Sequence, residues 1–367
     1  MKNKNAKSGG GILGGLLFLV IGIGILWSNE GRTVKTQSAI LEAKKTYIQV
    51  KSDKVDSKND GKLVATKGKI NIDAAEELKD DTFGIAVKAV KMKRNVEMYQ
   101  WKESCKTDDN DKTTCTYEKV WESKLLDSSE YKEAGHTNPT DMLYESEVYI
   151  ANDVKLGAFT LPEELVKSLG YDKKKTNDEL TTEYNNSKEN IKVDGKYLTN
   201  VNADGPVVGD LRISYEYTTI KNASVIGVQT DDTFEAFTSK KGKDIYTIVE
   251  GNKTGAQILE NMISANKTIK WGLRILGVAL VIGAFSSMFS FITNLASKVP
   301  VLGAIIGGAT SLVSTILGIG VSLLVIAIAW FRFRPILSIV LIAIVIALIV
   351  FLKVYVPKTK KEVKETK

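Results

Sequence analysis

Four long apolar segments, one near the start of the chain and three near its end, dominate the hydrophobic pattern of these 367 residues. About 20 apolar residues, each rising roughly 1.5 Å, cross the hydrocarbon core of a bilayer as a helix. None of the four segments contains Asp or Glu, so we expect each to be a membrane-spanning helix. The predicted helices occupy residues 10–28, 271–292, 299–331 and 335–353, with a folded domain at 29–270 and tails at 1–9 and 354–367.

The third apolar segment is longer than one straight crossing needs. Residues 299–331 would form a helix of about 50 Å. Pro300 lies at its start, and Gly303, Gly307 and Gly308 loosen its first third. We expect 301–309 to be an interfacial or re-entrant approach and 311–331 to be the span itself. Tilt of the helix would account for part of the excess length.

The polar middle of the chain predicts an α+β domain in which strands dominate, large enough to bury its own core. Short runs of β-branched and aromatic residues between turn residues predict strands: 47–50, 63–70, 85–101, 114–121, 148–150, 154–159, 211–218, 223–228, 234–237 and 245–249. We expect the last four to form one antiparallel meander. The remaining pattern predicts helices at 73–78, 161–169 and 257–270, a short helix or connector at 29–46, and a loop or weak helix at 173–190.

The basic charge of the chain lies outside the predicted domain. The formal charge is +7, of which residues 1–9 carry +3 and the tail from Lys353 carries +4. Four basic residues in or beside the C-terminal apolar segments add +4, which leaves −4 for residues 29–270. Short flanks rich in Lys and Arg stay in the cytoplasm, so we expect both termini there and an extracytoplasmic domain. Arg332 and Arg334, expected on the domain's side, depart from this rule. The acidic domain has no basic stripe, which argues against nucleic-acid binding.

The first apolar segment has the basic start and the apolar run of a signal peptide. The residues that follow it, Trp27-Ser28-Asn29-Glu30, contain no clear small-x-small cleavage site. We therefore favour an uncleaved signal anchor over a cleaved signal peptide.

Cys105 and Cys115 are the two cysteines of the chain, and a polar, turn-like stretch separates them. In an oxidising compartment they would join the two arms of a hairpin, worth roughly 2–3 kcal/mol for so short a loop. Two free thiols on a loop are the alternative. We expect no metal site because neither His nor a second pair of cysteines accompanies them.

Sequence signatures of an enzyme are nearly absent. His136, the one histidine of the chain, lies in a turn-like run where a structural hydrogen bond is the simpler role. The chain has no P-loop, no G-x-S-x-G and no paired Cys/His spacing, and its carboxylates are scattered. We therefore expect a protein that is not an enzyme, with no catalytic, cofactor-binding or metal-binding residues and no cofactor. An extracytoplasmic hydrolase would need carboxylates in a deep cleft around His136.

The predicted spans carry small and hydroxyl residues in place of carboxylates. No acidic residue occurs between Glu260 and Glu362, whereas ion-coupled carriers place carboxylates or His inside the helical bundle. Two G-x-x-x-G pairs permit close approach of helices: Gly11 with Gly15, and Gly303 with Gly307. We expect the helices to pack within one chain, between copies, or against other membrane proteins. A channel or transporter component, lined by Ser and Thr of the third segment, is the alternative.

Six short motifs occur in order along the chain: Asn29-Glu30-Gly31-Arg32, Val96-Glu97-Met98-Tyr99-Gln100-Trp101, Gly135-His136-Thr137-Asn138-Pro139, Val208-Gly209-Asp210-Leu211-Arg212-Ile213-Ser214, Lys270-Trp271-Gly272-Leu273-Arg274 and Arg334-Pro335. Together, with one apolar segment before a large domain and three after it, they resemble the transmembrane protein 43 (LUMA) family. The likeness covers nearly the whole chain. The Lys-rich tails depart from the family pattern, and the two cysteines are not counted as part of it.

The resemblance implies a four-span protein whose domain lies in a lumen or outside the cell. Animal members are associated with the endoplasmic reticulum and the inner nuclear membrane. They are thought to organise membrane-protein complexes there, including those with lamin and emerin, and to contribute to signalling. The family offers no established catalytic residue to carry over. The expected function is thus that of a multi-pass membrane scaffold, with the lipid bilayer and other membrane proteins or its own copies as partners. Its location would be the plasma membrane in a bacterium, or the endoplasmic reticulum or inner nuclear membrane in a eukaryote.

The motif residues are expected to have structural roles. Trp271 and Arg274 lie where an interfacial anchor of a membrane helix belongs. Glu30 and Arg32 lie at the outer end of the first apolar segment. We predict an ion pair between Glu30 and Arg274 at the membrane surface, which a separation of more than about 10 Å would exclude.

Overall fold

The computed structural model describes all residues except 1–9, 73–76, 108–111, 185–187, 189, 297–302, 332–334 and 366–367. The chain divides into two compact units. The helical unit contains residues 1–45, 238–244 and 259–367, and the strand unit contains residues 46–237 and 245–258. The predicted α+β class, with a strand-rich region between apolar helices, is confirmed.

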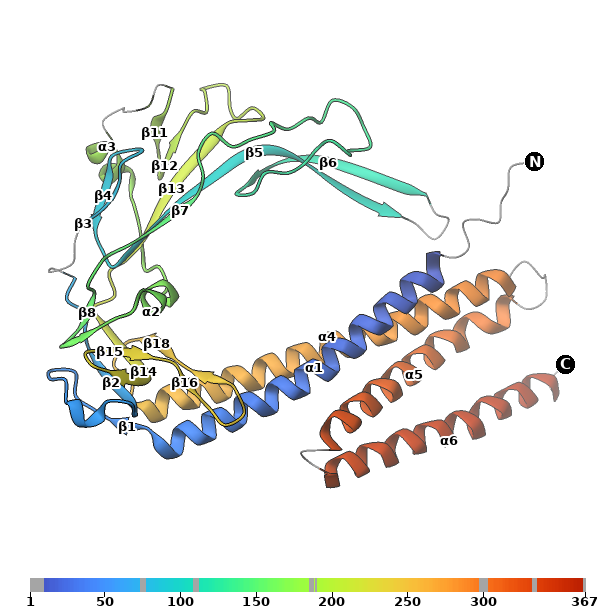
Figure 1. The fold of residues 1–367 in the computed structure, drawn as a ribbon. Coiled ribbons are helices and arrows are strands. Elements are labelled where there is room, and N and C mark those ends of the chain that lie inside the picture. The colour runs from blue at the N-terminus through green and yellow to red at the C-terminus, as the bar shows by residue number, and fades with distance from the viewer. Residues whose placement is uncertain are drawn as a thin grey trace. The chain divides into compact units, whose positions relative to one another are not determined.

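Four long helices carry the apolar segments (Figure 1): α1 (Gly10–Thr46), α4 (Gly255–Ala296), α5 (Gly303–Phe331) and α6 (Pro335–Glu365). Stretches long and apolar enough to cross a membrane lie at Ile12–Thr46, Gly255–Ser290 and Ser311–Phe331. Within the described part of α6, the apolar stretch is the shorter Ile336–Phe351. The helical unit therefore contains all four apolar segments predicted from the sequence.

The helices of the model extend past the predicted segment limits. α1 continues without a break through residues 29–46, where the sequence predicted a separate short helix or connector. The reason is that this stretch contains no Pro and buries Ala39, Ile40 and Ala43 along one side. Likewise, α4 begins at Gly255 and runs through the predicted limit at 270. The predicted helix at 257–270, leading into the second span, is therefore confirmed, whereas the stretch at 29–46 continues α1 and is not a separate element.

The predicted approach at 301–309 is not set apart from the span. α5 is one continuous helix from Gly303, so the described part of that approach belongs to the helix that ends at Phe331. The glycines at 303, 307 and 308 lower helix propensity but do not interrupt the helix. Residues 299–302 lie outside the described part of the chain.

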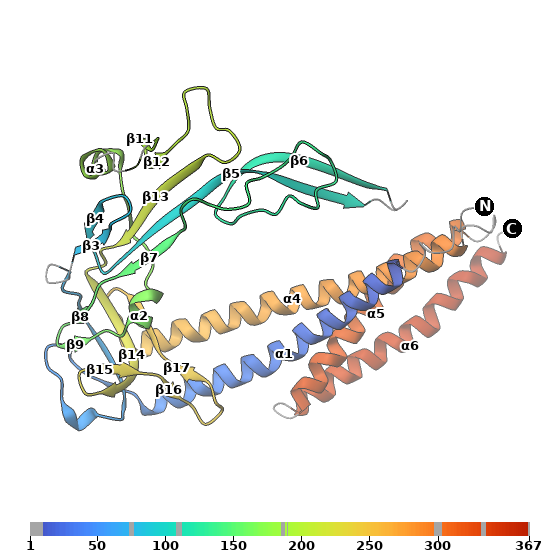
Figure 2. The ribbon, with the colours of Figure 1, turned by 45° about the horizontal axis from the view of Figure 1, so that its top comes forward.

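α1 and α4 run beside one another over part of their length (Figures 1 and 2), and glycines allow close contact between them there. A Cβ added at Gly22 would lie 2.8 Å from Cγ2 of Val281, and one added at Gly277 would lie 2.7 Å from Cγ of Leu26. A Cβ at Gly15 would lie 2.9 Å from the carbonyl oxygen of Ala284. Close helix approach therefore occurs as predicted at Gly15, but Gly22 and Gly277 lie outside the two predicted G-x-x-x-G pairs.

Two larger sheets organise the strand unit. The five-stranded sheet has the order β1-β2-β14-β15, with β18 also paired to β14. The seven-stranded sheet has the order β11-β12-β13-β5-β6, with β10 paired to β13 and β7 paired to β5. The strands of the first sheet are β1 (Ile48–Gln49), β2 (Leu63–Lys69), β14 (Asn222–Thr230), β15 (Thr233–Glu235) and β18 (Thr247–Glu250). Those of the second are β5 (Lys91–Thr107), β6 (Thr113–Glu122), β7 (Glu147–Ile150), β10 (Lys173–Lys174), β11 (Lys192–Asp194), β12 (Tyr197–Thr199) and β13 (Leu211–Thr218).

Smaller elements complete the described part of the strand unit. They are β3 (Glu77–Asp80) with β4 (Ile85–Lys88), β8 (Lys155–Leu156) with β9 (Phe159–Thr160), β16 (Phe237–Thr238) with β17 (Asp244–Ile245), α2 (Glu163–Ser168), α3 (Asn177–Glu183) and the 3₁₀ turn Ser57–Asn59. Of these, the hairpin of β16 and β17 falls at the limit between the two units.

Several predicted elements differ from those observed. Glu77 and Leu78 belong to β3 and not to a helix, because they pair with Lys88 and Val87 of β4; residues 73–76 lie outside the described part. The predicted strand at 154–159 is a hairpin that turns at Gly157, whose φ of 63° favours glycine. The predicted meander is wrong, because β13 and β14 belong to different sheets. Part of 173–190 is ordered as β10 and α3, the latter with a capping box at Thr176.

β5 is the longest of the described strands, and from Met92 to Gln100 its residues alternate between a buried and a half-exposed face. Met92, Val96 and Met98 point into the hydrophobic core of the unit, where Ile213 of β13 joins them. The intervening residues of β5 form the other, polar face of the sheet. This alternation, with a period of two, gives one strand a core side and a side that can hold functional groups.

Candidate functional site

The motifs at the ends of the apolar segments meet in a buried cluster of the helical unit. Arg274 of α4 donates two hydrogen bonds to Glu30 of α1, from Nε to Oε1 at 2.6 Å and from an Nη to Oε2 at 2.9 Å. The indole N–H of Trp330, on α5, also donates to Glu30. The Glu30 and Arg274 side chains are only 2% and 10% exposed. The predicted pairing of Glu30 with Arg274 is thus confirmed.

Two indole rings enclose the guanidinium of Arg274. Its central carbon lies 5.0 Å from the ring centre of Trp271 and 4.9 Å from that of Trp330. Arginine is well suited to this position because its flat guanidinium can stack on rings while it binds a carboxylate with two hydrogen bonds. The ion pair of Glu30 and Arg274 therefore joins three helices: α1 carries Glu30, α4 carries Arg274 and Trp271, and α5 carries Trp330.

A second set of polar contacts lies beside this ion pair. Asn29 is 2% exposed and donates from Nδ2 to the carbonyl oxygen of Lys270 at 3.0 Å. Arg32 donates to Oδ1 of Asn266 at 2.9 Å and to Oδ1 of Asn29 at 3.1 Å. The bonds to Lys270 and Asn266 join α1 to α4, whereas the bond from Arg32 to Asn29 lies within α1; together they satisfy most of the buried polar atoms there. Gly31, the remaining motif residue, has open space where a Cβ would lie.

The motifs of the strand unit meet on the polar face of the seven-stranded sheet. Glu97 of β5 and Arg212 of β13 are direct partners in the sheet register. Arg212 donates to both carboxylate oxygens of Glu97, at 2.7 and 3.1 Å. Its guanidinium lies between Trp121, at 4.6 Å, and Tyr197, at 5.0 Å from the ring centres. Tyr99 packs on Trp121, with ring centres 5.1 Å apart.

The side chain of Asn138 binds the backbone of β5 beyond Met98, which pairs with the first residue of β13. Its Oδ1 accepts from the backbone N–H of Trp101 at 2.7 Å, and its Nδ2 donates to the carbonyl oxygen of Trp101 at 2.8 Å. The side-chain amide therefore replaces the backbone of a neighbouring strand. Nearby, Gly209 donates from its backbone to the carbonyl oxygen of Tyr99 at 2.9 Å, and Tyr99 donates to that of Asp210 at 2.8 Å.

Glycines at two of the motif turns have left-handed backbones. The φ of Gly209 is 100°, and the φ of Gly135 is 92°. Side chains rarely tolerate such angles, so glycine is required for local geometry at both positions. A Cβ at Gly209 would also touch Pro139, at 3.5 Å from its Cγ. These two motifs are therefore in contact through their turns.

His136 lies in an aromatic stack. Its ring is stacked on Tyr117 with centres 3.9 Å apart, and it meets Trp101 edge-on at 4.5 Å. Its Nδ1 faces the carbonyl oxygen of Glu133 at 3.4 Å. Tyr117 in turn donates to Glu103. Hydrogen bonds from the backbone of Lys132 and from Tyr117 hold the pKa of the Glu103 carboxyl below its usual range. These contacts give His136 a packing role at the start of the hairpin.

The two cysteines are joined in a disulfide across the hairpin of β5 and β6. Glu103 is close to both sulfurs, and this is the one group of three candidate metal ligands that we find among the described residues. A disulfide sulfur is not a thiolate, the form that binds metals. The cluster therefore has no usable metal-ligand set while the disulfide is intact.

The last motif is described only in part. Arg334 lies outside the described residues, and Pro335 begins α6, where a helix tolerates proline.

Sequence reasoning missed a buried charge network in the core of the strand unit. Arg94 of β5 donates to both oxygens of Asp80, at 2.8 and 2.7 Å, and Tyr215 donates to Asp80 at 2.6 Å. Arg94 also binds Glu147 at 3.0 Å. Burial alone would raise the pKa of Asp80, but the hydrogen bonds from Tyr215 and Arg94 outweigh it and lower that pKa below its ordinary value. One signal in the sequence points to Arg94: it occupies the same side of the alternating pattern as the buried Met92 and Val96.

The sequence of this chain is similar to those of known membrane proteins. A family model described as Transmembrane protein 43 matches residues 98–335. Transmembrane protein 43 of Homo sapiens is 25% identical over 376 residues, covering 97% of this chain and 93% of its own length. The Transmembrane protein 43 homolog of Drosophila melanogaster is 26% identical over 346 residues, covering 89% of each chain.

No solved structure matches this chain. The family model nevertheless covers more than half of it, and the animal relatives align along nearly its full length. With its apolar helices, this likeness identifies an integral membrane protein. The chain belongs to the transmembrane protein 43 family.

Proposed function

We propose that this protein is a non-enzymatic scaffold that organises membrane-protein complexes. The observation that carries the proposal is the cluster of Glu30, Arg274 and Trp330, which fixes α1, α4 and α5 to one another. The motif residues described in both units serve as internal ion pairs, stacked rings and turn glycines. Such residues stabilise a defined surface and do not converge on a reacting group. His136, the one histidine, is likewise engaged in aromatic packing.

The outer sides of the helices supply the surface that such a scaffold needs. Leu17 of α1, Ile275 of α4 and Ile336 of α6 are 58%, 69% and 78% exposed. In a bilayer these side chains face either lipid or another membrane protein, and both are apolar. Selective packing against a partner would therefore depend on shape, which a fixed arrangement of helices provides. The proposed orientation has both termini in the cytoplasm and the strand unit on the extracytoplasmic side, in agreement with the basic tails.

A photochemical crosslinking experiment tests the scaffold. A photoreactive phenylalanine analogue would replace Leu17, Ile275 or Ile336 in the full chain, expressed in its native membrane and then irradiated. We expect at least one of these positions to give a discrete crosslinked product with a second polypeptide. The same analogue in place of Leu26, which is 0% exposed, is the control and should give no product of higher mass.

Two results would contradict the proposal. One is a chain that remains monomeric and uncrosslinked at all three exposed positions although the analogue is incorporated. The other is a selective ionic current across a planar bilayer that contains only the purified protein, because it would establish the channel alternative.

A further inference from the structure

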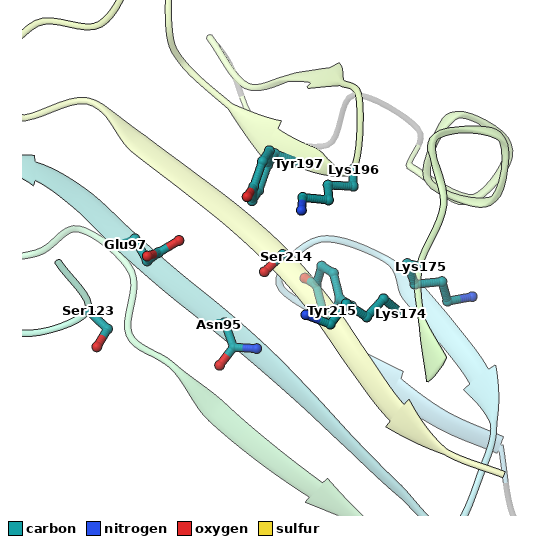
Figure 3. Close-up of a pocket in the computed structure, with 9 residues that line it drawn as sticks. All are labelled: Asn95, Glu97, Ser123, Lys174, Lys175, Lys196, Tyr197, Ser214 and Tyr215. Carbon is teal, nitrogen blue, oxygen red and sulfur yellow. The ribbon is translucent and has the colours of Figure 1, made fainter. Parts of the chain in front are cut away.

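A cavity of about 280 Å³ lies on the polar face of the seven-stranded sheet, and its lining mixes cationic, hydroxyl and amide groups. Figure 3 shows Asn95 and Glu97 on β5, with Ser214 on β13 beside them. Lys196 and Tyr197 lie at β12, Lys174 and Lys175 at β10, and Ser123 just beyond β6. The cavity therefore combines residues from five segments that are distant in the sequence.

The acidic residue in the lining is neutralised within the protein. Glu97 accepts two hydrogen bonds from Arg212, at 2.7 and 3.1 Å. Trp121 and Tyr197 hold the Arg212 guanidinium in place, which keeps this ion pair fixed beside the cavity. Lys175 is buried and paired with Glu183. With Glu97 and Lys175 in these two ion pairs, the positive charge that is not paired in the lining belongs to the other two lysines.

Lys174 and Lys196 supply that charge. Both side chains are exposed and line the cavity. Among the described residues, neither takes part in an ion pair, and Glu216, opposite Lys174 in the register, forms none with it. The ammonium of Lys196 lies 5.4 Å from the ring centre of Tyr197. An anionic group that entered the cavity would thus meet two ammonium groups not committed to carboxylates.

The neutral lining groups define the rest of the ligand. Ser123, Ser214 and Tyr197 offer hydroxyls, and Asn95 offers an amide, all of which can donate and accept hydrogen bonds. A simple inorganic anion would use the lysines but leave these groups to water. A ligand that carries hydroxyls next to its anionic group would use both. The volume of about 280 Å³ is sufficient for a single sugar ring and not for a long chain.

We propose that this cavity binds an anionic sugar, that is, a sugar ring bearing a carboxylate or a phosphate. The anionic oxygens would contact Lys174 and Lys196, and the ring hydroxyls would bind the serines and Asn95. Glu97 and Arg212, which belong to two of the family motifs, are positioning residues that keep the floor of the cavity rigid and neutral. This assignment is independent of the scaffold function, because it requires no protein partner.

Calorimetric titration of the purified full chain in detergent tests the assignment. The probes are glucose 6-phosphate, glucuronate, glucose and inorganic phosphate. We expect at least one of the two charged sugars to bind, with glucose and phosphate each about tenfold weaker or more, because glucose lacks the anionic group and phosphate lacks the ring hydroxyls. The two charged sugars distinguish a phosphate from a carboxylate as the preferred anion.

Variants locate the binding to this cavity. The double variant Lys174→Gln/Lys196→Gln should weaken binding of the charged sugar about tenfold or more. Lys240→Gln/Lys241→Gln, which changes two exposed lysines away from the cavity lining, should leave it unchanged. Thermal melting of both variants would verify folding. The assignment is overturned by the absence of binding for every probe, by equal affinity for glucose and the charged sugars, by equal affinity for phosphate alone, or by an unchanged affinity in the cavity variant.

Discussion

At the scale of single residues, two buried ion pairs differ in how far the sequence predicts them. Glu30 and Arg274 belong to motifs at the ends of two apolar segments, and that position predicts their pairing. Asp80 and Arg94 lie within mixed runs of charged and polar residues. Only the fold shows that β3 and β5 bring them together below the surface. This pair differs from the many other charged residues in its burial, which the residue types alone do not predict.

The first prediction concerns Arg274→Gln. It leaves Glu30 buried without its ionic partner, which should lower the free energy of unfolding by about 3–5 kcal/mol. Thermal unfolding of the purified chain in detergent measures the loss. The double variant Glu30→Gln/Arg274→Gln should recover part of it, because no unpaired charge remains. Lys267→Gln, an exposed change on the same helix, is the control. Equal melting of Arg274→Gln and Lys267→Gln would show that the pair is not important for stability.

The second prediction concerns the pH dependence of Asp80. Its pKa in the folded chain is below the ordinary value of 3.8, so the unfolded chain takes up a proton first as the pH falls. The stabilisation from Asp80 is therefore complete above that value and is lost as the pH drops through the lower folded pKa. Asp80→Asn should be destabilised relative to wild type at pH 7, by about 3 kcal/mol or more, and the difference should shrink in acid.

Asp81→Asn is the matched control for this experiment. Asp81 is 85% exposed and, among the described residues, forms an ion pair with the exposed Lys79 alone, so its removal should change stability by less than about 1 kcal/mol. Melting temperatures would be measured for the three proteins between neutral and acidic pH. A gap between wild type and Asp80→Asn that stays constant throughout this range would contradict the assigned pKa direction.

At the scale of elements, the long apolar run predicted its helix better than the alternating pattern predicted its strand. The predicted span at 311–331 lies within α5, whereas the predicted strand at 85–101 is observed as two strands, β4 and β5. The sequence did not reveal pairing between distant strands: β13 and β14 follow one another but join different sheets, with β5 and β2 as their respective partners. The site on the polar sheet face shares this limit, because Glu97 and Arg212 become neighbours only through the pairing of β5 with β13.

The third prediction tests the close contact of α1 with α4. Gly22→Ala would place a Cβ 2.8 Å from Val281 and 3.1 Å from the backbone oxygen of Gly277. Such overpacking should cost about 1–3 kcal/mol. Gly24→Ala is the matched control, since a Cβ there meets nothing within 4 Å and alanine favours the helix. Melting of the two variants should therefore differ, with Gly22→Ala the less stable. The reverse order would exclude a tight glycine contact between these helices.

At the scale of the whole molecule, hydropathy, charge and family membership agree on a multi-pass membrane protein with a large strand-rich region. The central claim is the arrangement across the membrane that the proposed scaffold requires: a strand unit outside and two basic tails inside. The charge distribution supports it, since the tails carry +3 and +4 while residues 29–270 carry −4. Arg332 and Arg334 depart from the rule, so a direct measurement of sidedness is the decisive one.

That measurement is cysteine labelling of spheroplasts with a membrane-impermeant maleimide after expression in a bacterium. Wild type is the blank, because its two cysteines are joined in a disulfide. Asn252→Cys introduces a thiol at an exposed position of the strand unit, and Lys364→Cys introduces one in the C-terminal tail. We predict that the cysteine at 252 is labelled in intact spheroplasts and that the one at 364 is labelled only after permeabilisation. Labelling of position 364, but not 252, in intact spheroplasts would contradict the proposed arrangement.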